Sequence, residues 1–140
     1  SFTGHCAVLS TTNYNVIEAS KTKGSGDKVH HWNRTNLWSG ASGITQYKVT
    51  TQSGEEATPE ERVRAVNYGL KQEDKPYRIL TTLNDTSRWY CSKLTYKMWK
   101  DVGYYISSKK FKIWVTPNDI ALDANLRVVK NWDKELPGII

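Results

Sequence analysis

A helix start near the middle of the chain constrains the fold more than any other sequence feature. Thr58, Pro59 and Glu61 occupy the N-cap, N1 and N3 positions of a helix, which is the pattern of a capping box. Apolar residues then recur at helical spacing up to about residue 72, at Val63, Val66 and Leu70. The sequence therefore predicts an amphipathic helix that lies between two stretches of strand character.

The segments on either side of this helix have the alternation and the residue types of β-strands. We expect a β-hairpin formed by residues 4–10 and 16–19, with a tight turn at Thr11 and Thr12. Further strands are predicted over residues 44–51, 111–115 and 126–132. Residues 21–43 carry several glycines and asparagines, so we predict a long irregular loop that is functional or mobile.

A second amphipathic helix is expected to begin at Cys91 and to end at Gly103. Its inner stripe would consist of Leu94, Met98 and Val102, and its outer face of Lys93, Lys97 and Lys100. Thr116 and Pro117 repeat the capping pattern, so a short helical turn should follow. Strands and helices do not alternate regularly, which favours the α+β class, and 140 residues suit a single domain over 1–140.

The net charge of +6 raises the question of a nucleic-acid partner. The basic residues are scattered, however, and neither an RNP motif nor a zinc-finger spacing is present. No apolar run approaches the ~20 residues that a membrane-spanning helix needs. We therefore predict a monomer with no nucleic-acid partner and no membrane span.

The two cysteines, Cys6 and Cys91, have different surroundings. Cys91 stands at a predicted helix start, where the partial positive charge of the helix end stabilises a thiolate and unpaired N–H groups can bind an oxyanion. It is a candidate nucleophile, and a buried structural thiol is the alternative. A Cys6–Cys91 disulfide is possible in a secreted protein. Cys6 follows His5 directly on a predicted strand, so it should point to the opposite face and belong to the core.

His5 and Glu18 are the candidate partners of this thiol. His5 begins an apolar strand and suits a general base, while Glu18 lies inside the apolar run 16–19, where a solvated carboxylate is unexpected. With a tight turn, residues 5 and 18 face each other, so Glu18 would orient the imidazole. The alternatives are a strand-end histidine bonded to backbone and an edge-strand glutamate in contact with solvent.

The predicted loop 21–43 contributes Trp32 and Trp38 as candidate substrate-binding aromatics, because the loop follows directly on the strand that carries Glu18. His30 and His31 are adjacent, whereas metal ligands on one element usually stand two to four residues apart. We predict neither a metal site nor a cofactor.

Five short blocks together resemble the circularly permuted NlpC/P60 papain-like hydrolases of the YycO and YiiX type. They are Gly4-His5-Cys6-Ala7-Val8-Leu9, Val16-Ile17-Glu18-Ala19, Lys75-Pro76-Tyr77, Trp89-Tyr90-Cys91-Ser92-Lys93-Leu94 and Thr116-Pro117-Asn118-Asp119-Ile120. The histidine block precedes the cysteine block, which is the permuted order.

The resemblance implies an antiparallel sheet packed on a helix with the nucleophilic cysteine at its N-terminus. It assigns Cys91 as nucleophile, His5 as base and Glu18 as third residue, with Tyr77 and Ser92 in oxyanion or substrate binding. The implied activity is a cysteine amidase or peptidase acting on bacterial cell-wall peptides, in a secreted or cell-surface protein. The alternatives are a lipid or acyl transferase with a broad apolar groove, and a catalytically silent polymer-binding module.

Overall fold

The computed structural model describes residues 4–10, 14–21, 26–39, 43–107, 114–123 and 126–133. Within these ranges the strands are β1 (Val8–Leu9), β2 (Asn15–Ser20), β3 (Lys28–Asn33), β4 (Gly43–Val49) and β5 (Leu126–Asp133). The helices are α1 (Thr35–Trp38), α2 (Pro59–Leu70), α3 (Cys91–Lys100) and α4 (Pro117–Ala121). The α+β class predicted from the sequence is confirmed.

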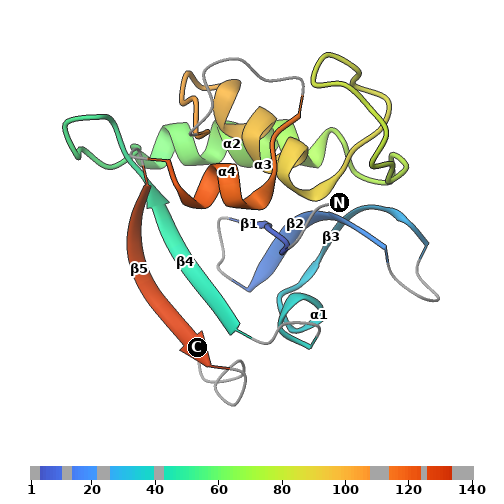
Figure 1. Cartoon of the computed structure of the whole chain (residues 1–140), viewed down its shortest axis with the longest axis horizontal. Helices are drawn as coiled ribbons and strands as arrows, with labels where there is room; N and C mark the ends of the chain where they lie inside the picture. The colour runs from blue at the N-terminus through green and yellow to red at the C-terminus, as the bar shows by residue number, and fades with distance from the viewer. Residues whose placement is uncertain are drawn as a thin grey trace.

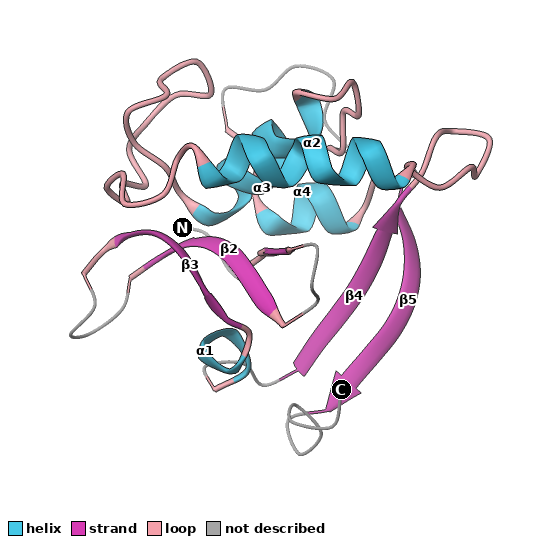
Figure 2. Ribbon diagram, turned by 180° about the vertical axis from the view of Figure 1, so that it is seen from behind, coloured by secondary structure: helices cyan, strands magenta, loops and turns pink. Residues whose placement is uncertain are grey.

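The strands form two separate antiparallel sheets. One has the order β1-β2-β3, and the other is a two-stranded ribbon of β4 and β5. Helices α2, α3 and α4 form a layer on one side of the three-stranded sheet, and the ribbon extends away from the end of that layer (Figures 1 and 2). No helix in the described part of the chain is long and apolar enough to cross a membrane.

The core lies where α2 and α3 pack on β2. Its largest buried side chains include Ile17 of β2, Leu94 and Met98 of α3 and Trp89 just before α3. Gly69 of α2 makes this close packing possible, because a Cβ at that position would lie 2.6 Å from Met98 Cε and 3.2 Å from Ile17 Cγ2. The helix with the candidate nucleophile is therefore seated firmly on the strand that carries Glu18.

The helix starts predicted from the sequence are confirmed. Thr58 and Glu61 form the capping box of α2, with Pro59 in the first turn, and Thr116 and Asp119 repeat that arrangement at α4. Helix α3 begins at Cys91 as expected. One prediction for its faces is wrong, because Lys93 is fully buried rather than on the outer face.

The prediction of an irregular loop over residues 21–43 is also wrong for the described residues 26–39. They contain β3, which pairs with β2 along its whole length, and the short helix α1. Val29 and His30 are buried in this strand, and such a strand lacks the clear alternation that identifies a half-exposed one. The turn at residues 11–12 and residues 111–113 of another predicted strand lie outside the described residues.

Candidate active site

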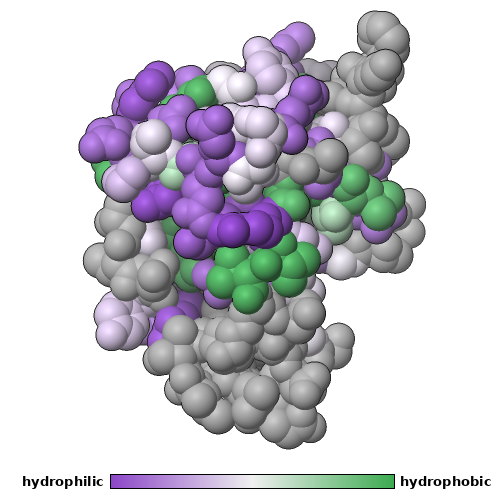
Figure 3. All heavy atoms as spheres, turned by 90° about the vertical axis from the view of Figure 1, so that its left-hand side faces the viewer, coloured by the Kyte–Doolittle hydropathy of each residue, from purple (hydrophilic) through white to green (hydrophobic). Residues whose placement is uncertain are grey.

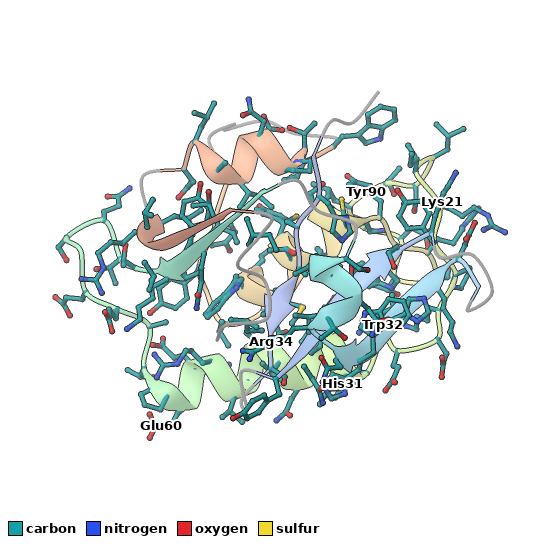
Figure 4. The ribbon with its side chains drawn as sticks, turned by 90° about the horizontal axis from the view of Figure 1, so that it is seen from below. Lys21, His31, Trp32, Arg34, Glu60 and Tyr90 are labelled. Carbon is teal, nitrogen blue, oxygen red and sulfur yellow. The ribbon has the colours of Figure 1, made fainter. Side chains whose placement is uncertain are left out.

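The segment around Cys91 is anchored on both sides to the chain just before α4. The backbone N–H of Val115 donates to the Tyr90 hydroxyl at 3.2 Å, and the Ser92 hydroxyl donates to the Val115 carbonyl at 2.5 Å. Cys91 itself is only 4% exposed. Its position at N1 places it beside the backbone N–H groups that the first turn of a helix leaves without helical partners. Figure 4 labels Tyr90 at this helix start.

The loop that leads into α3 is organised by the buried ammonium of Lys93. Lys93 Nζ donates to the carbonyl oxygens of Asp85 and Arg88 and to the Thr81 hydroxyl, and it lies 4.7 Å from the centre of the Trp89 ring. Burial lowers the pKa of Lys93 to about 8, although the charge of Asp85 opposes this change. The lysine thus holds the loop that determines where α3 begins.

Residues 75–78 connect this loop to the edge of β3. The Tyr77 N–H donates to the Asp27 carbonyl at 2.9 Å, and the N–H of Trp89 donates to the Pro76 carbonyl at 3.0 Å. Tyr77 also lies close enough to Cys91 to be influenced by its charge. Burial, followed by the charges of Cys91 and Asp27, raises the pKa of the Tyr77 hydroxyl, which is therefore a neutral donor at physiological pH.

His5 joins the two other candidate catalytic residues. Its Nε2 donates to Glu18 Oε1 at 2.7 Å, which leaves Nδ1 as the ring nitrogen for Cys91. Burial disfavours the charged ring, but hydrogen bonds to Cys91 and Glu18 outweigh it and raise the pKa of His5 to about 9. The structure therefore brings together all three residues that the sequence predicts.

Glu18 has a partner for each carboxylate oxygen. Its Oε1 accepts from His5, and its Oε2 accepts from Trp32 Nε1 at 2.8 Å. The Trp32 ring stacks on His30 with 3.7 Å between ring centres, so the tryptophan is itself held in place. Figure 4 labels Trp32 and shows it on β3. This glutamate is 3% exposed, and hydrogen bonds to both oxygens offset the cost of burying the carboxyl group.

The register predicted for the first hairpin is wrong, although the contact it predicted is present. Val8 pairs with Ile17 and Leu9 with Val16, which corresponds to a shift of two residues from the predicted pairing. His5 lies before β1 and outside these paired residues, so the strand register does not determine the contact. Its Nε2 nevertheless lies 2.7 Å from Glu18 Oε1.

Cys6 packs against the hydrophobic core as predicted, but the prediction that it points away from the site is wrong. The thiol of Cys6 hydrogen-bonds to the Cys91 sulfur and to Thr95, one helical turn further along α3. The Cys6 hydrogen bond makes the largest contribution in lowering the pKa of Cys91 to about 4, and His5 adds a hydrogen bond and an opposite charge. The prediction failed because residues 5–7 precede β1 and do not follow strand alternation.

A groove of about 1640 Å³ runs from this cluster along the molecule between the three-stranded sheet, the helices and β4. The lining near the site consists of His5, Cys6, Glu18, Trp32, Tyr77 and Thr95. The walls of the groove also include the apolar residues Val8, Val16, Ile44, Val66, Ile106 and Ile120.

The remaining predicted site residues have different placements. Trp32 lines the groove as predicted, and it also has the role of holding Glu18, which sequence reasoning missed. The fully buried Ser92 hydroxyl is bonded to Val115, so the Ser92 side chain faces the body of the protein rather than a substrate. The side chain of Trp38 lies outside the described residues. The hydrogen bond from the Trp32 indole to Glu18 depends on how β3 pairs with β2, and the sequence did not predict β3.

Comparison with known proteins gives the fold of this chain. No protein-family model matches the sequence. No curated protein matches it either. Among solved structures, the metalloprotein YiiX from Escherichia coli O157:H7 matches with a TM-score of 0.67 and 14% sequence identity, over 90% of this chain and 80% of that chain. The chain therefore shares its fold with YiiX.

The description of YiiX as a metalloprotein raises the question of a metal site in this chain. Within the described residues, no group of three or more His, Cys, Asp or Glu side chains is placed to hold a metal ion. Zinc sites in proteins use four such ligands, or three and a water molecule. The residues described here do not fit a metal.

Proposed function

We propose that this protein is a cysteine hydrolase of the permuted NlpC/P60 papain-like type, with Cys91 as nucleophile, His5 as acid and base, and Glu18 as the residue that orients His5. The observation that carries the proposal is the contact chain from Cys91 through His5 to Glu18. Thiolate, imidazole and carboxylate in this order are the parts of a thiol-based catalytic triad. The structural likeness to YiiX agrees with the resemblance of the sequence motifs.

The shifted pKa values favour a thiolate and an imidazolium as the resting state between about pH 4 and pH 9. The thiolate attacks the carbonyl carbon of an amide, and the oxyanion faces the N–H groups at the start of α3 and the Tyr77 hydroxyl. The imidazolium then protonates the leaving amine. Neutral His5 next takes a proton from the water that hydrolyses the thioester.

The substrate class follows from the resemblance of the sequence to the family. We propose peptides of the bacterial cell wall as substrates and a secreted or cell-surface location for the enzyme. A net charge of +6 is compatible with an anionic polymer as partner. We propose that the protein acts as a monomer.

The groove supports acyl transfer as a second candidate function. Its walls include apolar side chains from β1, β2, β4 and α2 as well as His5 and Cys6. Such a groove suits an acyl chain, whereas a hydrolase for short polar peptides does not need it. The two functions share the first step and differ in whether water or another nucleophile accepts the acyl group.

The pH dependence of Cys91 alkylation tests the proposed nucleophile. Iodoacetamide should label Cys91 rapidly from about pH 5, well below the ordinary cysteine pKa of about 8.5, whereas Cys6 should react slowly because its pKa is raised. On an active amide substrate, kcat/KM should rise as the pH increases through about 4 and should fall as His5 loses its proton near 9.

Cys91→Ala and a metal chelator are the controls for this test. Cys91→Ala should abolish turnover of amide and ester substrates, and a chelator should have no effect on the wild-type protein. Equal labelling of the two cysteines would contradict the assignment of Cys91. Loss of activity with a chelator and its return with a divalent cation would replace the thiol mechanism by a metal-dependent one. Transfer of the acyl group to an added alcohol in preference to water would favour the second candidate.

A further inference from the structure

The candidate active site contains a second thiol that takes no covalent part in the proposed hydrolysis. Cys6 is half-buried, follows His5 in the chain, and its thiol contacts both the Cys91 sulfur and Thr95. Cys91 and Thr95 are four residues apart on α3 and therefore share one face of the helix. Cys6 is thus seated against the face of α3 that carries the nucleophile.

The protein contains two cysteines, and the structure places both at this point in their reduced form. They are 85 positions apart in the sequence, so their contact is a product of the fold. Residues 5–7 lie before β1 and outside any strand. Cys6 can therefore move toward Cys91 without breaking strand pairing.

The two sulfur atoms differ in their chemistry. The hydrogen bond from Cys6 and the charge of His5 lower the pKa of Cys91, while contact with Cys91 and burial raise the pKa of Cys6. At neutral pH one sulfur is a thiolate and the other a thiol. Peroxides oxidise thiolates to sulfenic acids, and a neighbouring thiol converts a sulfenic acid to a disulfide.

We infer that Cys6 and Cys91 form a redox modification site, at which a peroxide converts the nucleophile into a reversible Cys6–Cys91 disulfide. This inference shares the Cys91 thiolate with the proposed function, but it requires no substrate. In the disulfide form Cys91 has no free thiolate for attack on a carbonyl. The disulfide also protects Cys91 from further oxidation to sulfinic acid, which thiols do not reverse.

Oxidation of the cysteine pair takes two steps. In the first, the Cys91 thiolate attacks one oxygen of hydrogen peroxide, an S–O bond forms and the O–O bond breaks. Hydroxide leaves and takes a proton from the His5 imidazolium, which gives water. In the second, the Cys6 sulfur attacks the Cys91 sulfur, the S–S bond forms and the S–O bond breaks, and the hydroxide leaves as water with the Cys6 proton. The cysteine pair loses two electrons, and the peroxide gains them.

Mass spectrometry of the full chain tests this inference without an activity assay. Equimolar hydrogen peroxide should lower the mass of the reduced protein by about 2 Da, which corresponds to two hydrogen atoms. Tryptic digestion without reductant should then yield peptide 1–21 linked to peptide 89–93, because these contain Cys6 and Cys91. Dithiothreitol should restore the reduced mass.

Two variants make the test specific. In Cys6→Ser, peroxide should leave a sulfenic acid on Cys91 that dimedone traps, and excess peroxide should oxidise it irreversibly, with a gain of about 32 Da. Thr95→Val is the matched control, since it alters a Cys6 contact but keeps both thiols, and it should still form the disulfide. Dimedone should label wild-type Cys91 at least tenfold less than Cys91 in Cys6→Ser.

Three results would overturn the inference: a persistent sulfenic acid on wild-type Cys91, equal dimedone labelling of wild type and Cys6→Ser, or a disulfide formed only between two chains. None of them bears on hydrolysis, because reduced protein can be assayed separately. Conversely, if the disulfide forms but the protein hydrolyses no amide, the redox site is supported and only the proposed function is contradicted.

Discussion

The two sheets of this protein differ in how far they shield apolar and acidic side chains from water. In β2 the consecutive residues 16–19 are all buried, so both faces of the strand are shielded from water. In the β4–β5 ribbon, exposure varies along β4, and Val128 and Val129 of β5 are 51% and 45% exposed. Figure 3 faces the ribbon side, where hydrophobic and hydrophilic side chains both reach the surface.

Glu18 and Glu56 show the consequence of this difference. Glu56 is exposed beside the ribbon and pairs with Lys48 at 3.2 Å and with Arg127, and exposed pairs of this kind contribute only about 0–1 kcal/mol. Glu18 is buried, and its two partners are the ring N–H groups of His5 and Trp32. The two glutamates therefore differ in burial and not in whether they have partners.

The same substitution at both glutamates tests this comparison most strongly. In Glu18→Gln the amide oxygen can accept from His5, but the amide NH₂ then faces the Trp32 N–H, and the charge that stabilises the imidazolium is lost. Turnover should fall by about ten-fold to a thousand-fold, roughly 1.4 to 4 kcal/mol of transition-state stabilisation. The His5 pKa, measured by NMR titration, should fall as well.

Glu56→Gln is the matched control and should change turnover by less than a factor of about two, in keeping with an exposed pair. Trp32→Phe keeps the charge of Glu18 and removes only one donor, so its effect should lie between the other two. Wild-type turnover in folded Glu18→Gln would make Glu18 a bystander and leave the third position to another polar residue such as Ser20 or Gln46.

The sequence was sufficient to predict the elements whose signals are local. The capping residues at Thr58 and Thr116 predicted the starts of α2 and α4, and the start of α3 at Cys91 followed from the helical spacing after it. Strand β3 was missed, because its burial comes from pairing with β2 and from packing. Local patterns do not encode such partners.

For the site too, the sequence predicted only the residues whose signals are local. His5 and Glu18 were found from their residue types, a histidine at the start of one apolar run and a carboxylate inside another. The positions of Cys6 and Lys93 were not, because one depends on the irregular backbone before β1 and the other on carbonyl groups of a loop. Contacts that the tertiary fold creates between irregular segments have no periodic signature in the sequence.

A substitution at Lys93 tests whether a buried charge also matters outside the proposed triad. Lys93→Met keeps the length of the side chain but leaves the carbonyl groups of Asp85 and Arg88 without their donor. We expect a loss of roughly 1–3 kcal/mol in the free energy of unfolding, measured by urea denaturation. Lys100→Met, in the last turn of the same helix, should cost less than about 1 kcal/mol. Equal losses in the two variants would show that the loop carbonyls find other donors at no cost.

The smallest effect is expected at Val128, which is tested by making the same substitution once in each sheet. Val29 of β3 is 0% exposed and belongs to the core, whereas Val128 of β5 is half exposed. Val29→Thr places a hydroxyl among apolar side chains, which should lower the free energy of unfolding by roughly 1–3 kcal/mol. Val128→Thr keeps a β-branched side chain that meets water, so its stability should stay within about 0.5 kcal/mol of the wild type. Urea denaturation measures both, and a loss at Val128 as large as that at Val29 would mean that the ribbon is covered in solution and that the contrast between the two sheets is wrong.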